Sequence, residues 1–304
     1  MNRRLYRLLL WLLPAMLLIT GCGEGSGASS GAASSPPTHA ASSGGSTAAP
    51  SAGQDPSPEG ELTVTVFQTG KSDCILIETA GGAALIDTAD KGDGKELVQE
   101  LEKRGVRKLE LLLLTHLDKD HIGGAARILE NFPVERLVQA DYDEDSGPYE
   151  KYQEACAALG LTPLRLREEM TLTLGGASLT LTPGAHPPYE QDNDYSIITA
   201  MEYGEIRFLF AGDAEKDRLG EFLSSGGGPA DFLKVPHHGR YNGLSAAFLD
   251  AVRPTWAVIT CSEKEPPEEE LLELLRRGGA KTLLTSGGPV TAVSDGKTLA
   301  VTQG

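Results

Sequence analysis

The chain has 304 residues, which is enough for one large domain or two small ones. It carries 27 Lys and Arg against 43 Asp and Glu, and this net charge of −16 argues against a broad electrostatic grip on nucleic acid, although a local basic groove is not excluded. Its four cysteines are widely spaced and indicate neither a zinc knuckle nor a disulfide framework, while a disulfide between any two of Cys74, Cys156 and Cys261 stays open.

The first 22 residues have the pattern of a secretory signal. Three arginines precede an apolar run, Leu8 to Ile19, that is too short for an ordinary membrane-spanning helix. The run continues into Thr20-Gly21-Cys22, and small residues directly before a cysteine resemble the lipobox of bacterial lipoproteins. The resemblance implies cleavage before Cys22 and a lipid on its sulfur. The alternative is a plain secretory signal in which Cys22 is incidental.

Residues 23–60 form a linker of Ser, Ala, Gly, Thr and Pro with almost no large apolar side chain. Such a segment cannot bury enough surface to offset the entropy of ordering, so we expect it to be disordered, with a reach of about 35 Å. We therefore expect an extracytoplasmic lipoprotein that is anchored to the cell membrane through Cys22. Residues 61–304 have a normal globular composition and form one predicted domain.

The globular domain opens with runs that predict strands. Residues 62–66 alternate apolar and polar side chains, as a half-buried strand does. Two apolar runs follow at 74–78 and 83–87, and the Gly81-Gly82 pair between them predicts a hairpin.

The rest of the domain mixes helices and strands. Asp93 and Glu96 have the spacing of a capping box at the start of a helix. Residues 109–115 form a continuous apolar run, which is typical of a strand buried on both faces. We expect further helices at 124–131, 149–159, 215–224, 246–252 and 268–277, and strands at 171–174, 178–181, 196–202, 206–211, 232–235, 257–260, 281–284 and 289–293. This order predicts an α/β protein with two mixed sheets flanked by helices, rather than a doubly wound parallel sheet.

The segment that carries chemistry directly follows the buried strand. It reads Thr115-His116-Leu117-Asp118-Lys119-Asp120-His121-Ile122-Gly123-Gly124. Imidazoles and carboxylates at alternate positions of a tight turn can converge on one point, and they are the ligands expected for Zn²⁺ or Mn²⁺. The alternative is a solvated polar loop, but four potential ligands within six residues argue against it.

This segment resembles the His-x-His-x-Asp-His signature of the metallo-β-lactamase fold, with Asp118 in place of the second His. That variant is typical of the hydrolase domain of ComEC-type competence proteins and their free-standing relatives. The resemblance implies an αββα sandwich with the site at one edge. Further motifs similar to that family follow in its order, at Thr69-Gly70-Lys71-Ser72-Asp73-Cys74-Ile75-Leu76-Ile77, Leu85-Ile86-Asp87-Thr88, Phe210-Ala211-Gly212-Asp213 and Phe232-Leu233-Lys234-Val235-Pro236-His237-His238-Gly239.

The resemblance implies a dinuclear metal site. It assigns His116 to the first ion, Asp120 and His121 to the second, and Asp213 to a bridge between them, although Asp213 before a helix also fits an N-cap. Asp118 is a hard ligand in a position where an imidazole is usual, which favours Mn²⁺ and weakens the first site.

Three further histidines have less certain roles. His238 is the expected ligand of the tandem pair, because a His directly before Gly ends this motif. His237 either acts in catalysis, by orienting substrate or acting as an acid, or supports the site from behind. His186 resembles the ligand in a Thr-Pro-Gly-His turn, but one residue is inserted here and ComEC-type domains commonly lack this His. Asn193 is expected to shape a turn rather than to touch the substrate.

The expected reaction is hydrolysis. Two divalent ions, Zn²⁺ or Mn²⁺, hold a hydroxide at neutral pH and neutralise a substrate phosphate, and Asp120 and His237 are the expected catalytic residues. A phosphodiesterase is therefore the leading prediction, and a nuclease related to DNA uptake is its narrower form. The alternatives are hydrolysis of cell-envelope or small extracellular esters or lactams, and a non-catalytic lipoprotein that binds a ligand. The sequence indicates no obligate protein partner.

Overall fold

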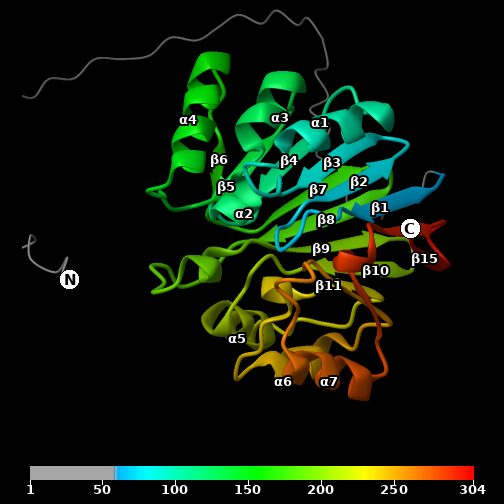
Figure 1. The fold of residues 1–304 in the computed structure, drawn as a ribbon. Helices are drawn as coiled ribbons and strands as arrows, with labels where there is room; N and C mark the ends of the chain where they lie inside the picture. Colours follow the sequence, from blue (N-terminus) through cyan, green and yellow to red (C-terminus); the bar gives the residue numbers. More distant parts are fainter. Residues whose placement is uncertain (1–57, 59) are drawn as a thin grey trace, which may run out of the picture. The chain divides into compact units, whose positions relative to one another are not determined.

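Two mixed β-sheets pack face to face, and helices cover the outer face of each (Figure 1). In this computed structural model the described residues are 58 and 60–304. The predicted signal, Cys22 and almost all of the predicted linker lie outside the described residues. No helix in the described part of the chain is long and apolar enough to cross a membrane. The predicted α/β sandwich of two mixed sheets is confirmed.

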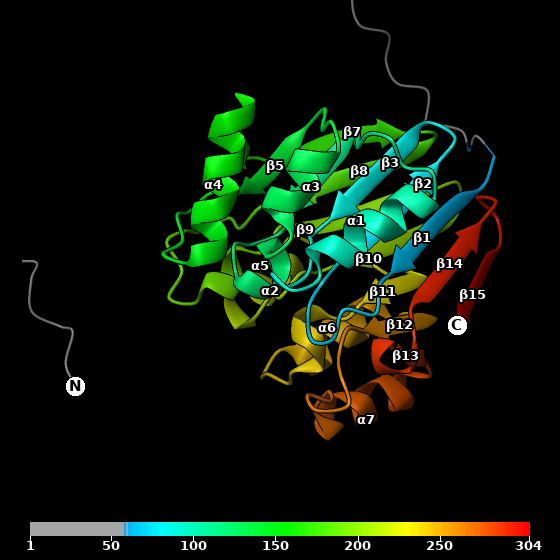
Figure 2. The ribbon, with the colours of Figure 1, turned by 45° about the horizontal axis from the view of Figure 1, so that its top comes forward.

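The first sheet has the strand order β15-β14-β1-β2-β3-β4-β5-β6 (Figure 2). Neighbouring strands from β15 to β3 pair antiparallel, whereas β3, β4, β5 and β6 run parallel. Helices α1 (Gly94–Lys103), α3 (Ala125–Asn131) and α4 (Gly147–Leu159) cover its outer face. The strands are β1 (Leu62–Val66), β2 (Ile75–Thr79), β3 (Gly82–Ile86), β4 (Leu111–Leu114), β5 (Leu137–Ala140), β6 (Leu164–Leu166), β14 (Val290–Ser294) and β15 (Leu299–Gln303).

The second sheet has the order β13-β12-β11-β10-β9-β8-β7, of which β10 to β13 are parallel. Helices α5 (Lys216–Ser224), α6 (Ser245–Val252) and α7 (Glu269–Gly278) cover it. One short helix, α2 (Lys119–Ile122), and three 3₁₀ turns, η1 (Asp192–Tyr195), η2 (Pro236–Gly239) and η3 (Thr285–Gly287), connect these elements. The strands are β7 (Met170–Leu174), β8 (Ala177–Thr182), β9 (Ile198–Tyr203), β10 (Ile206–Phe210), β11 (Phe232–Lys234), β12 (Trp256–Ile259) and β13 (Lys281–Leu284).

Apolar side chains fill the space between the sheets. Leu62, Val64 and Val66 of β1 are fully buried, as the alternation of that strand predicts. They share a core with Phe208 and Phe232 of the second sheet, whose ring centroids lie 5.6 Å apart. Each such side chain contributes about 1.5–3 kcal/mol on burial, so the strands form a stiff base for the loops at their ends.

Three strands of the structure, β5, β6 and β15, are absent from the sequence prediction. β15 has no buried residue, and β6 has three residues of which only Leu166 is buried, so neither strand carries a clear hydrophobic signal. The predicted capping box is wrong: Asp93 stands at the N-cap of α1 without a side-chain cap, and its Oδ2 accepts from the Asp90 N–H at 3.3 Å instead.

The three described cysteines, Cys74, Cys156 and Cys261, are free and buried. They act as small buried apolar groups. The structure forms no disulfide among these three residues, which settles the alternative that the sequence left open.

Candidate metal centre

Polar side chains from both sheets meet at the edge where parallel strands end. Asp87 follows β3, His116 follows β4, Asp213 follows β10, His238 follows β11, and Thr260 follows β12. Parallel strands place their carboxyl ends at one edge of a sheet, so residues far apart in sequence come together there. All five side chains are buried.

Five predicted ligands, which we call the donor cluster, converge at this edge: His116, Asp120, His121, Asp213 and His238. Asp213 lies between two imidazoles, with Oδ1 3.3 Å from His121 Nε2 and Oδ2 3.0 Å from His238 Nε2. One ligand atom each from His116, His121 and Asp213 lie within 4.8 Å of one another, and so do those of Asp120, His121 and His238. Two overlapping groups of three ligands thus share His121.

The donor cluster fits divalent ions because four of its buried ligand atoms make no hydrogen bond, although they lie close to one another. The Nε2 atoms of His116, His121 and His238 and the Oδ1 atom of Asp213 are buried without a hydrogen bond. Each buried polar atom without a hydrogen bond lowers the stability of the fold by about 1–3 kcal/mol. Four such atoms in one place therefore indicate a site that a bound ion would complete. Nitrogen and carboxylate oxygen donors suit Zn²⁺ or Mn²⁺.

Hydrogen bonds on the far side of each imidazole fix which nitrogen faces the cluster. The Thr260 hydroxyl donates to Asp73 at 2.6 Å, so it can only accept from His238 Nδ1–H, 2.9 Å away. The Thr115 hydroxyl donates to Asp87 at 2.7 Å and likewise accepts from His116 Nδ1–H at 3.2 Å.

His121 Nδ1 lies 2.8 Å from the carboxylate of Asp87, to which it donates. All three rings therefore turn Nε2 toward the cluster, which is the orientation that a metal ligand needs. Burial lowers the pKa of His121, but Asp213 and Asp87 raise it well above its usual range, so a metal ion would take the place of the proton on its Nε2.

A buried ammonium lies beside the carboxylates of the cluster. Lys234 is fully buried, forms an ion pair with Asp73, donates to the Gly212 carbonyl at 3.0 Å and lies 3.5 Å from Asp213 Oδ1. Burial lowers the pKa of Lys234, but the carboxylates of Asp73 and Asp213 raise it by more. The net pKa is therefore above its usual value, and the ammonium stays charged. Burial raises the pKa of Asp213, but His238, His121 and Lys234 hold it well below its usual range, so Asp213 stays ionised.

The turn η2 sends the tandem histidines in different directions. His237 (φ 47°, ψ 49°) and His238 (φ 52°, ψ 27°) both have left-handed backbone, and Gly239 follows at φ 80°. Such conformations cost about 1–3 kcal/mol each for non-glycine residues and cluster at functional sites. As a result the His238 side chain is buried in the donor cluster, while the His237 side chain is 15% exposed at its rim.

A carboxylate and an amide hold His237 at the rim. Its Nδ1 lies 2.9 Å from Glu215 Oε1, and its Nε2 lies 3.9 Å from Asp213 Oδ2. Asn193 Nδ2 donates to Glu215 at 3.1 Å and lies 3.4 Å from His237 Nε2, so Asn193 contacts the site in addition to shaping a turn. Because Asp194, not Asp213, accepts from the first N–H groups of α5, the N-cap alternative for Asp213 does not hold.

Two predicted ligands do not share this geometry. His186 is exposed, and its backbone N–H donates to Tyr189 and Glu221, which hold its loop against α5 and away from the donor cluster. Asp118 lies at the margin, with Oδ2 3.9 Å from His116 Nε2, and burial raises its pKa to about 6. The structure thus brings six of the seven predicted ligands to this edge and leaves His186 outside.

Four residues that no sequence pattern had assigned a role now surround the ligands: Lys234, Asp87, Thr260 and Glu215. Asp87 and Lys234 could have been found from the sequence, because each is a charged residue at the end of an apolar strand. Thr260 and Glu215 gave no such signal, because only the fold brings them to the histidines.

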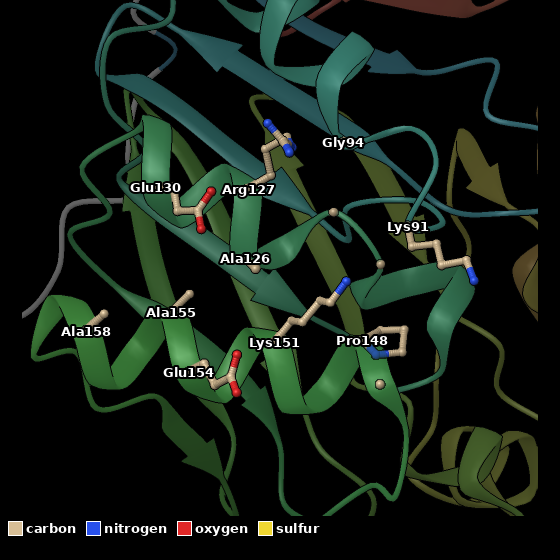
Figure 3. Close-up of a pocket in the computed structure, with 13 residues that line it drawn as sticks. Lys91, Gly94, Ala126, Arg127, Glu130, Pro148, Lys151, Glu154, Ala155 and Ala158 are labelled. Atoms are coloured by element: carbon tan, nitrogen blue, oxygen red, sulfur yellow. The ribbon is translucent and has the colours of Figure 1, made fainter.

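A groove on the helical face of the first sheet is separate from this site. It has a volume of about 490 Å³ and lies between α1, α3 and α4, with Lys91, Arg127 and Lys151 among its lining side chains (Figure 3). None of its lining residues belongs to the donor cluster. Gly123 and Gly124, which directly follow the metal-binding segment, form part of its wall.

The family model described as Metallo-beta-lactamase superfamily matches residues 68–261, which is more than half of the chain and contains the whole donor cluster. The chain belongs to the metallo-β-lactamase superfamily. Membership of this superfamily supports a metal-dependent hydrolase. The predicted similarity to competence proteins is also confirmed, because curated competence proteins match this chain.

Three curated relatives of this superfamily member are competence or recombination proteins. ComE operon protein 3 of Bacillus subtilis (strain 168) is 30% identical over 196 residues, which cover 63% of this chain and 25% of that protein. Recombination protein 2 of Haemophilus influenzae is 28% identical over 225 residues (70% and 26%). Competence protein ComA of Neisseria gonorrhoeae is 27% identical over 236 residues (75% and 31%). The matched region spans only about a quarter to a third of each relative.

Among solved structures, YhfI of Bacillus subtilis, described as a metallo-beta-lactamase fold protein, matches with a TM-score of 0.49 and 14% identity. The match covers 74% of this chain and 96% of that chain.

Proposed function

We propose that this protein is a metal-dependent phosphodiesterase that acts outside the cytoplasm from a lipid anchor on Cys22. The observation that carries the catalytic part is the set of four buried, unpartnered donor atoms on His116, His121, His238 and Asp213. The localisation is supported by the lipobox-like sequence before Cys22 and by the composition of residues 23–60.

The residues of the donor cluster would hold two divalent ions, and Asp213 would act as a ligand from its place between His121 and His238. Bound ions would supply Lewis-acid charge next to a substrate phosphate and lower the pKa of a water molecule. Asp87 and Thr260 fix the imidazoles so that their Nε2 atoms need not reorganise, which is the preorganisation that makes such sites effective.

The rim residues supply contacts for an anionic substrate. Lys71 Nζ lies 4.0 Å from Asp120 Oδ2 and can pair with a non-bridging phosphate oxygen. During hydrolysis the water oxygen bonds to phosphorus and gives up a proton, while the bond between phosphorus and the leaving oxygen breaks and that oxygen takes up a proton. The proton that water loses can pass through His237 Nε2 or through solvent. His237, held through Nδ1 by Glu215, can present Nε2 to that leaving oxygen or orient the phosphate.

A phosphodiester is favoured by the similarity to competence and recombination proteins and by the Lys71 cation at the rim. A nuclease is the narrower form of this proposal. The net charge of −16 disfavours a long nucleic-acid track, so a short strand end or a small diester fits better than a long duplex.

Thioester hydrolysis is the second candidate. Hydroxyacylglutathione hydrolase GloC of Haemophilus influenzae is 33% identical over 101 residues, which cover 33% of this chain and 44% of that protein. Turnover of a phosphodiester and of a glutathione thioester, measured side by side on the same metal-loaded protein, separates the two candidates.

The test is a substrate panel with purified protein that has been stripped of metal and reloaded with Mn²⁺ or Zn²⁺. We expect turnover of a generic phosphodiester that disappears with chelator and falls by a factor on the order of 10³ or more in Asp120→Ala and Asp213→Ala. Lys71→Ala should raise KM for the diester more than it lowers kcat. Hydrolysis of a thioester or lactam with no diester turnover would replace the proposal, and a folded Asp120→Ala variant with wild-type rates would remove this site from catalysis.

A further inference from the structure

A small pocket with two tyrosines in its wall lies at the edge of the sheets that carries the donor cluster. It has a volume of about 270 Å³, and we call it the tyrosine pocket after Tyr189 and Tyr195. One charged pair, Asp141 and Arg167, forms part of the wall. The other side chains of the wall are aliphatic or proline: Leu166, Pro183, Ala185 and Pro187.

Strand directions place the tyrosine pocket at this edge. Asp141 follows β5 and Arg167 follows β6, and both strands run parallel to β3 and β4. Pro183 follows β8, which runs in the same direction as β10 because both pair antiparallel with β9. Tyr195 directly precedes the start of β9 at the same edge. The pocket and the donor cluster are therefore built on the ends of the same two sheets.

Two short chains of contacts join the tyrosine pocket to the metal-binding residues. The Tyr195 ring stacks on the Tyr142 ring with their centroids 4.5 Å apart, and the Tyr142 hydroxyl accepts from the Leu117 N–H at 2.6 Å. Leu117 lies within the metal-binding segment. Ser196, the neighbour of Tyr195 in the chain, accepts from the Asp213 N–H through its hydroxyl at 3.0 Å. A substrate whose phosphate lies at the donor cluster can therefore place a neighbouring group in the pocket.

One carboxylate holds the loop that forms part of the pocket wall. Glu221 on α5 accepts from the backbone N–H groups of Ala185 and His186, at 2.9 and 3.0 Å. The same carboxylate accepts from the Tyr189 hydroxyl at 2.6 Å. The Tyr189 ring in turn meets the Tyr195 ring edge to face, with centroids 5.0 Å apart. The wall is thus formed before a ligand arrives, so binding costs little ordering entropy.

We propose that the tyrosine pocket binds the nucleobase of a nucleotide substrate whose phosphate lies at the donor cluster. Aromatic side chains stack on the flat face of any nucleobase. The volume of the pocket is just below the range of about 300–1,000 Å³ that holds whole drug-sized ligands, so it suits a single ring system. Arg167 donates to both oxygens of Asp141, at 2.6 and 3.2 Å, and so fixes a carboxylate that would accept from an N–H group at the edge of the base.

A saturated sugar fits this wall less well than a nucleobase. The hydroxyl groups of a sugar point in all directions, and each needs a hydrogen-bond partner when it is buried. Apart from Asp141, Arg167 and the tyrosine hydroxyls, the lining side chains offer no donor or acceptor, and the Tyr189 hydroxyl is already bonded to Glu221. A nucleobase is apolar on its faces and polar only at its edge, which matches a wall with one polar side. This inference rests on the proposed function, since it names the group that the phosphodiester carries.

The first experiment compares two diesters with the same leaving group, thymidine 5′-(4-nitrophenyl) phosphate and methyl 4-nitrophenyl phosphate, on metal-loaded protein. Wild-type kcat/KM should be at least tenfold higher for the thymidine diester, the size expected for one stacked base. Tyr195→Leu should lower this ratio to about one, whereas Tyr195→Phe, which keeps the ring, should retain it. A Tyr195→Leu variant that loses both activities equally and keeps the wild-type ratio would overturn the proposal, because Tyr195 would then be structural only.

A binding measurement separates this inference from the proposed function. Equilibrium dialysis on the same proteins compares thymidine 5′-monophosphate with 2-deoxyribose 5-phosphate, and circular dichroism establishes that the variants are folded. Wild type should bind the nucleotide at least tenfold more tightly, and Tyr195→Leu and Tyr189→Leu should each lose this preference. If neither diester is hydrolysed but the tyrosine-dependent preference remains, the proposed function is rejected and the tyrosine pocket stands. If both diesters are hydrolysed equally well and both phosphates bind equally, the pocket is rejected and the proposed function stands.

Discussion

At the scale of single residues, the site depends on groups that never touch an ion. Asp87 accepts from Thr115 at 2.7 Å and from His121 Nδ1 at 2.8 Å, so one carboxylate sets the orientation of two neighbouring segments. Thr260 orients His238 in the same way: its hydroxyl accepts from His238 Nδ1–H and donates to Asp73. These residues fix the ring nitrogens before any metal arrives, and their loss should appear first in metal affinity.

Asp87→Ala should weaken metal binding by about 10–100-fold, the usual effect of removing a group that orients a metal-bound histidine. The His121 ring would lose its Nδ1 partner and could rotate. Metal affinity is measured by competition with a chromophoric chelator, with Asp93→Ala as a control because Asp93 is an acidic loop residue outside the site. Unchanged affinity in Asp87→Ala would show that His121 needs no orienting partner.

His237→Ala and Glu215→Ala should each lower kcat for a phosphodiester by about 10²-fold, less than loss of a ligand. The double variant should be little worse than either single variant, because Glu215 acts through His237. Metal content should stay at the wild-type level in all three proteins. Additive losses, or loss of metal in Glu215→Ala, would assign Glu215 a role independent of His237.

At the scale of elements, short turns rather than long helices set the geometry. Helix α2 has only four residues and ends at Gly123, which packs closely against the loop after β3. A Cβ added to Gly123 would lie 2.1 Å from the backbone nitrogen of Lys91. The Gly-Gly pair after His121 is therefore a close-packing requirement between two loops, and it carries no chemistry of its own.

Gly123→Ala should destabilise the fold by about 1–3 kcal/mol, because the added methyl group meets backbone that cannot yield without moving α2. Gly147→Ala is the matched control, since an added Cβ at Gly147 meets nothing within 4 Å. Urea unfolding of the two variants and the wild type gives the free energies of unfolding. Equal stabilities for Gly123→Ala and the wild type would show that the two loops are not tightly packed.

At the scale of the whole molecule, the sequence predicts the αββα sandwich and the ligands at strand ends because periodic burial and local motifs are both encoded over short stretches. The roles of Lys234, Thr260 and Glu215 depend on which strand ends become neighbours, and no local pattern contains that information. The displacement of His186 has the same origin, since Glu221 on α5 holds its loop.

Cys22→Ala should release the protein from the membrane fraction or leave it unprocessed, because the proposed lipid is carried by the Cys22 sulfur. Fractionation of cells that express wild type and variant, with mass spectrometry of the N-terminal peptide, measures this. Cys156→Ala is a control, since Cys156 is buried in the domain and free. If Cys22→Ala fractionates as the wild type does and the wild-type peptide carries no lipid mass, the lipid anchor is rejected. The alternative, a plain secretory signal, then remains.

Elemental analysis of the purified protein after gentle dialysis tests the metal centre most directly. Three buried Nε2 lone pairs and one unpartnered Asp213 oxygen predict between one and two divalent ions per chain, the first held less tightly because Asp118 stands where an imidazole is usual. Asp213→Ala should retain less metal than the wild type while its circular dichroism spectrum is preserved. A folded wild-type protein that holds no divalent ion and takes up neither Zn²⁺ nor Mn²⁺ would contradict the account.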